Sequence, residues 1–312
     1  MIIQLNHNDL DAMGCHFVLR QKYEDILQLN TSYANIETQL DIIHDKLSYD
    51  KTVSEVFITD LSFNQEQYTA LLRIVSEFSN INFTFIDHHP VQFNVSANPK
   101  NMYCILSTEF SATKLTAQYL DIDNDFINAV DAFDTWKKGS KYFKYGFMLN
   151  TLYWDYKQKR FTYNFKSMQK PSESHLNDYK DLKDKKDKHF ANLRSKGLLL
   201  NDNKVLISFT DKHLNWIQID YPNEEFYINA TSYGTINIRI GDVVPEREAG
   251  ELKDILSKTL TQEDWFVDIG GHPRAFGIAH HGENNHLIIV ECVKHIFEEI
   301  KKIKEAKDTL CF

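Results

Sequence analysis

The chain has 312 residues, a formal net charge of −9 and 42% hydrophobic residues, which is long enough for two domains with separate cores. The acidic charge argues against a broad binding surface for long duplex DNA, and no apolar stretch approaches the roughly 18 residues that a membrane span needs. The first residues lack the pattern of a secretory signal, and the four cysteines show no CxxC spacing. We therefore expect a cytoplasmic protein with no membrane partner.

The first ninety residues predict parallel strands joined by helices. Three short runs of β-branched and aromatic residues read as strands, at residues 1–5, 56–59 and 83–86. Apolar residues recur at helical spacing in three segments between these runs, at residues 13–27, 36–47 and 65–78. The alternation favours a parallel βα sheet.

Each predicted strand ends in side chains that bind metal ions. These are His7, Asp9 and Asp11 after the first strand, Asp60 after the second, and Asp87, His88 and His89 after the third. The carboxyl ends of parallel strands meet at one edge of the sheet, where ligands bind. Carboxylate and imidazole groups suit Mn²⁺ and Mg²⁺, and this number of ligands suits two ions that share a carboxylate.

The rest of the chain predicts a connector and a second domain. A capped helix is expected at residues 107–120. Residues 126–136 carry two more acids, Asp131 and Asp134, and an aromatic and charged connector follows. Further on, strands are expected at residues 204–210, 225–231 and 236–240. A helix at 245–259 follows, then a glycine-rich segment at 267–277 and a closing amphipathic helix at 285–306. The prediction is therefore an α/β fold: a parallel-sheet domain at 1–140 with helices on both faces, a connector at 141–198, and a smaller α/β domain at 199–312 across a cleft.

Several strings of residues resemble a known family. HNDLDAMGC, FITDLS, IDHHP and FDTW are similar to motifs of the DHH phosphoesterase superfamily, and INIRI and GGHPRAFG resemble its associated DHHA1 substrate domain. The match spans most of the chain and is most like the DHH oligoribonucleases called nanoRNases, of the B type. Two positions depart from the pattern: Ile269 replaces a glycine, and Ile240 stands where a serine often follows arginine.

The resemblance implies a site with two divalent cations, Mn²⁺ by preference, with Mg²⁺ or Co²⁺ as alternatives. His7 and Asp9 would bind one ion, Asp11 and His88 the other, and Asp60 would bridge them.

The family pattern also implies roles for residues around the ions. Asp134 would be the fourth acidic ligand, with Asp131 as the alternative because both lie in VDAFDTW. His89 would face the substrate phosphate, and Asp87 would support His88 from behind.

In the second domain, phosphate or a terminal nucleotide is expected to bind four residues: Arg239, Gly270, Gly271 and His272. The implied activity is hydrolysis of short oligoribonucleotides to mononucleotides by a bridging hydroxide, in a protein that could form a homodimer. Three other substrates stay open: 3′-phosphoadenosine 5′-phosphate, linear or cyclic dinucleotides, and single-stranded DNA as in RecJ-like exonucleases. A binding scaffold that kept the fold is the alternative without catalysis.

Overall fold

The computed structural model divides the chain into two compact units, Met1–Lys183 and Asp184–Phe312. It describes residues 1–32, 35–91, 93–95, 98–196, 199–202, 204–209, 218, 221–231, 236–262, 265–272, 274–280 and 286–310. Within these residues, no helix is long and apolar enough to span a membrane.

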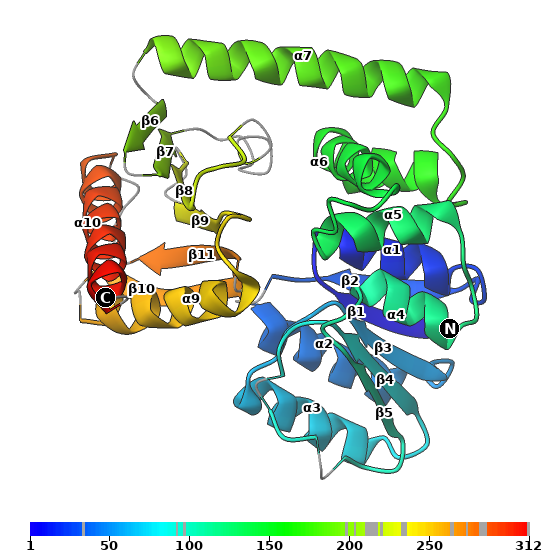
Figure 1. Cartoon of the computed structure of the whole chain (residues 1–312). Helices are drawn as coiled ribbons and strands as arrows, with labels where there is room; N and C mark the ends of the chain where they lie inside the picture. Colours follow the sequence, from blue (N-terminus) through cyan, green and yellow to red (C-terminus); the bar gives the residue numbers. More distant parts are fainter. Residues whose placement is uncertain are drawn as a thin grey trace. The chain divides into compact units, whose positions relative to one another are not determined.

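The first unit is built on a parallel sheet of five strands in the order β2-β1-β3-β4-β5 (Figure 1). The strands are β1 (Ile2–Asn6), β2 (Ile26–Asn30), β3 (Glu55–Thr59), β4 (Asn82–Asp87) and β5 (Met102–Leu106). Because all five run the same way, β1, β3 and β4 present their carboxyl ends at one edge.

Helices cover both faces of this sheet, because alternate residues of each strand point to opposite sides. On one face, Ile3 and Leu5 pack in a core with α2 (Ile36–Tyr49) and α3 (Gln65–Glu77). On the other face, Ile2 and Phe57 pack with Leu19 of the first helix. The helices on this side include α1 (Leu10–Leu19), α4 (Ala112–Tyr119) and α5 (Asp125–Asp134).

The aromatic segment after α5 forms helix α6 (Phe143–Phe165), which packs on α1 and α5. The ring of Phe161 stacks on Phe17 of α1, with 6.1 Å between centroids. The charged run that follows is α7 (Glu173–Ser195), where only Phe190 and Leu193 are buried among the described residues.

The second unit contains a mixed sheet of six strands in the order β10-β11-β9-β8-β7-β6. Its strands are β6 (Leu199–Asp202), β7 (Val205–Phe209), β8 (Phe226–Ala230), β9 (Ile236–Ile240), β10 (Phe266–His272) and β11 (Ala275–His280). Helices α9 (Glu246–Leu260) and α10 (His286–Leu310) contribute to its core. The predicted α/β class, with a parallel sheet and a second α/β unit, is confirmed.

Two predicted helices were wrong in detail, and one strand of the first sheet was missed. The helix expected at 13–27 is the shorter α1 followed by strand β2, which is half-buried along its whole length and so shows no clear alternation. Strand β5 was not predicted at all. Helix α4 begins at Ala112 and not at 107, because the side chain of Ser111 caps it by accepting from the Lys114 N–H.

Candidate metal centre

The carboxyl edge of the first sheet gathers the side chains that end β1, β3 and β4. Asp9 caps α1, with its Oδ1 accepting from the Ala12 N–H at 3.0 Å, and this places Asp11 in the first turn. Asp60 follows β3 in a left-handed backbone, with φ of 53°, and its N–H donates to the Ile86 carbonyl. Such a conformation is uncommon for a non-glycine residue and typical of functional sites.

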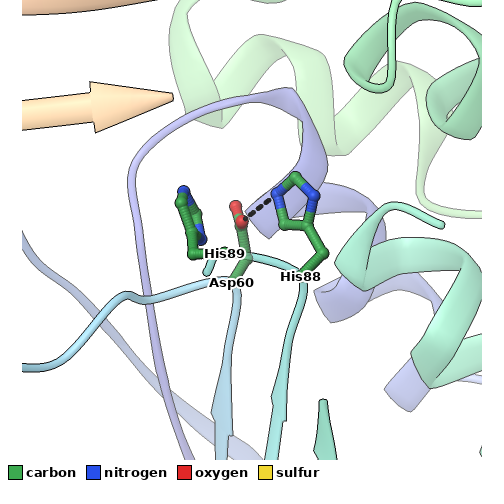
Figure 2. Close-up of side chains that lie close together, drawn as sticks. All are labelled: Asp60, His88 and His89. Carbon is green, nitrogen blue, oxygen red and sulfur yellow. Dashed lines mark ion pairs between the residues drawn. The ribbon is translucent and has the colours of Figure 1, made fainter. Parts of the chain in front are cut away.

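Seven side chains form three overlapping sets, and in each set the ligand atoms lie within 4.8 Å of one another. The sets are His7 with Asp9 and Asp60, Asp11 with His88 and Asp134, and Asp60 with His88 and His89. Figure 2 shows Asp60 between the two imidazole rings. Asp60 therefore belongs to two of the sets.

The imidazole of His88 is surrounded by carboxylates. Its Nε2 lies 3.4 Å from Asp60 Oδ1, 3.4 Å from Asp134 Oδ2 and 3.7 Å from Asp11 Oδ2. One N–H cannot satisfy three acceptors, and these distances exceed a normal N–H···O bond.

Burial and repulsion between like charges oppose the ionisation of Asp60 and Asp134 at this edge. Burial and the negative charge of Asp9 raise the pKa of Asp60 well above its ordinary value. Burial and the charge of Asp11 do the same to the pKa of Asp134. Burial opposes the charged form of His88, but the charges of Asp134 and Asp11 outweigh it and raise the pKa of the imidazole. A divalent cation would remove this repulsion.

In the pair of His7 and Asp9, the pKa of the aspartate is lowered, unlike that of Asp60 and Asp134. Burial would raise the pKa of Asp9, but the hydrogen bond with His7 Nδ1, at 2.9 Å, holds it below its usual range. Burial opposes the charged form of His7, yet the bond to Asp9 raises the pKa of His7. This carboxylate is already ionised, as a metal ligand must be.

Two buried oxygen atoms indicate that the residues fit a cation. Asp60 Oδ2 and Asp134 Oδ2 have no hydrogen-bond partner among the described residues, although buried polar atoms nearly always have one. Both belong to the sets of nitrogen and oxygen donors described above. Imidazole and carboxylate groups are ligands of Mn²⁺ and related ions.

The N-terminus of α4 holds Asp11 in place. The Ala112 and Thr113 N–H groups donate to its two carboxylate oxygens, at 2.7 and 2.9 Å, and the Thr113 hydroxyl donates to its carbonyl. This close approach requires Gly14 on α1, because a Cβ there would lie 2.1 Å from Thr113 Oγ1. Gly14 lies in HNDLDAMGC, but its contact with α4 was not predicted from the sequence.

The two acids of VDAFDTW take different places. Asp134 is the last residue of α5 and lies beside His88, whereas Asp131 is outside the three sets. Asp131 instead accepts from the Ser111 N–H at 2.8 Å and from Lys137 Nζ at 3.0 Å. The geometry favours Asp134 as the ligand, and Asp131 supports the residue that caps α4.

Asp87 has a partner that was not predicted. Its Oδ1 bonds His89 Nδ1 at 2.8 Å, while its expected support of His88 stays a prediction. His89 lies in a bend just after the end of β4, and the course of the chain there brings its ring to the carboxylate of Asp87. Asp87 therefore orients His89.

One contact with the segment that carries His7 and Asp9 was not predicted from the sequence. The hydroxyl of Tyr153 on α6 donates to Asn8 Oδ1 at 3.0 Å, between the candidate ligands His7 and Asp9. Burial and the charge of Asp9 raise the pKa of Tyr153. No sequence signal distinguishes this tyrosine from its neighbours in the aromatic segment.

In the second unit, the four predicted substrate residues lie on two strands that flank β11. Arg239 is on β9 and is half-buried, while Gly270, Gly271 and His272 end β10. Ala275 of β11 pairs with both Arg239 and His272, so these backbone positions are in register. Their roles toward substrate stay predictions.

No family model matches the chain. The sequence is 28% identical over 149 residues to the oligoribonuclease NrnB of Bacillus subtilis (strain 168), covering 42% of this chain and 36% of that protein. The chain thus spans little more than a third of the length of this relative.

Two solved structures share the fold over 96% of this chain. One is a DHH domain from a protein described as a member of a family of ribosomal proteins, with a TM-score of 0.60, 13% identity and 85% of its chain covered. The other is the pGpG-specific phosphodiesterase PggH of Vibrio cholerae, with a TM-score of 0.50, 13% identity and all of its chain covered.

The chain has the fold of a solved DHH domain, with an edge of aspartates and histidines. Part of its sequence is similar to an oligoribonuclease. Both findings agree with the resemblance to the DHH superfamily and to nanoRNases that the motifs predict. The roles of individual residues remain predictions.

Proposed function

We propose that the chain is a phosphodiesterase that hydrolyses short oligoribonucleotides to mononucleotides. The observation that carries the proposal is the grouping of seven candidate ligands at the carboxyl edge of a DHH-type sheet, with two buried carboxylate oxygens left without hydrogen bonds among the described residues. The oligoribonuclease relative supports RNA as the substrate.

Two divalent cations, Mn²⁺ by preference, would polarise the scissile phosphate and lower the pKa of the attacking water when bound. His7 and Asp9 would hold one cation, and Asp11 and His88 the other, with Asp60 shared between them. Asp134 would complete the second set beside His88.

His89 would bind the phosphate. Because Asp87 fixes its Nδ1, the ring is held in one orientation, and a protonated ring would donate from Nε2 to a non-bridging oxygen. This donor would neutralise charge that develops on the phosphate in the transition state. In the second unit, Arg239, Gly270, Gly271 and His272 would bind a phosphate or the terminal nucleotide.

A dinucleotide phosphodiesterase is the second candidate, because one structure with this fold is a pGpG-specific phosphodiesterase. The test compares labelled RNAs of two to five nucleotides with 3′-phosphoadenosine 5′-phosphate, cyclic dinucleotides and long single-stranded DNA, each with Mn²⁺, Mg²⁺ or chelator. We expect release of mononucleotides from the short RNAs with Mn²⁺ and none with chelator. A preference for the adenosine bisphosphate or long DNA would overturn the proposal, and RNA binding without any hydrolysis would favour a scaffold.

A further inference from the structure

A strip of four lysines follows the metal centre in the chain. Residues 136–145 carry positive charges and no acidic residue, in a protein whose net charge is −9. We name this set the lysine strip, and it consists of Lys137, Lys138, Lys141 and Lys144. All four side chains are exposed.

The strip is fixed to the core of the first unit. Trp136 has a left-handed backbone, with φ of 56°, which turns the chain just after Asp134. Its ring packs on Phe133 and Phe143, with centroids 5.7 and 5.2 Å away. The Ser140 N–H also donates to the Lys137 carbonyl at 2.9 Å. The ammonium groups therefore extend from an ordered turn.

The positive charge of the strip is only partly compensated. Lys137 Nζ lies 3.0 Å from Asp131 Oδ2, and Lys138 Nζ lies 5.1 Å from the centre of the Trp136 ring. In the part of the chain that the structure describes, neither Lys141 nor Lys144 takes part in a salt bridge.

Stability of the helix does not explain these lysines. Lys141 and Lys144 flank the beginning of α6, where the helix dipole is positive and a cation is unfavourable. An anion bound at this surface would turn the unfavourable charges into favourable ones.

The first lysine of the strip is linked to the metal centre through hydrogen bonds. Lys137 is three residues beyond Asp134, and its partner Asp131 accepts from the Ser111 N–H. The next residue, Ala112, donates to Asp11. A nucleic acid strand with its scissile phosphate at the centre would therefore have a neighbouring phosphate close to Lys137, where the strip begins.

We propose that the lysine strip binds the backbone phosphates that flank the scissile phosphate of a short RNA. The inference rests on the proposed function and deepens it, because it makes affinity grow with the number of phosphates. Single-stranded nucleic acid binds to basic surfaces in this way, with a dependence on salt set by the number of contacts.

The test uses the triple variant Lys138→Gln, Lys141→Gln and Lys144→Gln in the full chain. Its matched control replaces three exposed lysines that precede β2, β3 and β5, at the opposite edge of the sheet: Lys22, Lys51 and Lys100. Both variants lose the same charge. The measurement is KM with Mn²⁺ for a dinucleotide and a pentanucleotide RNA, over a range of salt concentrations.

We expect the strip variant to raise KM for the pentanucleotide about tenfold and KM for the dinucleotide less than about twofold. The slope of log KM against log salt should fall by about 0.7 for each lost contact. The control should behave as the wild type. Equal behaviour of the two variants would overturn the inference. Binding of both variants to anionic phosphatidylserine vesicles is measured as well. If the strip variant lost binding to the vesicles with no change in KM, the strip would bind membranes and not RNA, and the inference would be overturned.

The two proposals fail separately. If the wild type hydrolyses no RNA, the proposed function is wrong, and the labelled pentanucleotide stays intact. Fluorescence anisotropy of that RNA then compares the same variants, and a strip variant that binds as tightly as the control would overturn the inference as well.

Discussion

At the scale of single residues, the centre is defined by two buried carboxylate oxygens that lack hydrogen bonds within the described residues. Oδ2 of Asp60 and Oδ2 of Asp134 have no hydrogen bond within the described residues, whereas Asp131 accepts from both Ser111 and Lys137. A buried acid with satisfied oxygens has a structural role. An acid with a buried, unsatisfied oxygen beside His88 is a better candidate for a metal ligand.

Tyr153 tests how far the centre depends on residues behind its ligands. Replacing it by phenylalanine removes the hydroxyl that holds Asn8 between His7 and Asp9. We expect the Kd for Mn²⁺ to rise about tenfold, as is usual when a group that orients a ligand is lost. Isothermal titration calorimetry measures this change.

The matched control is Tyr156→Phe, on the same helix. The hydroxyl of Tyr156 donates to Asp178 of α7, which is not part of the centre. Its loss should leave the affinity for Mn²⁺ unchanged. An equal change in both variants would mean that α6 acts only through stability.

At the scale of elements, the contact between α1 and α4 aligns Asp11. Substitution of Gly14 by alanine would place a Cβ 2.1 Å from Thr113 Oγ1 and move the amides of α4 away from that carboxylate. Overpacking of this kind costs about 1–3 kcal/mol of stability. We expect a lower melting temperature together with weaker Mn²⁺ binding, measured by thermal denaturation with and without the ion.

Gly139 provides a comparison, since a Cβ there meets no atom within 4 Å. Gly139→Ala should change neither quantity. If Gly14→Ala kept the wild-type melting temperature and affinity, α4 would not be the element that positions Asp11.

The sequence predicted the strands that carry the ligands better than the contacts behind them. Three apolar runs followed by His7, Asp60 and His88 were enough to place these residues at one edge, because a parallel sheet aligns its carboxyl ends. The contacts of Tyr153 and of Gly14 with the centre join segments about a hundred or more residues apart, and no local pattern encodes them. The partner of Asp87 could not be predicted because it depends on the local course of the chain after β4.

At the scale of the whole molecule, the centre predicts how stability depends on pH. The pKa values of Asp60 and Asp134 are raised in the folded protein, and so are those of His7 and His88. A group with a raised pKa stabilises the fold below its ordinary pKa, and this contribution is lost as the pH rises through the raised value. For the two aspartates this loss begins at about pH 4.

In chelator, the melting temperature should therefore fall as the pH rises from 5 to 8, and Mn²⁺ should restore it. The measurement is differential scanning fluorimetry across this range, with and without the ion. Asp60→Asn should flatten the dependence, since it removes one of the titrating groups. A melting temperature that rises with pH in chelator would show that these acids are not held with raised pKa values.

The central claim is that Asp60, shared between two sets of ligands, supports phosphodiester hydrolysis. The most direct test is the rate of mononucleotide release from a labelled three-nucleotide RNA at saturating Mn²⁺, for the wild type and for Asp60→Asn. We expect the wild type to release mononucleotides and the variant to be slower by more than about a hundredfold, because even outer partners of metal ligands contribute 10–100-fold. Equal rates in the two proteins would contradict the account.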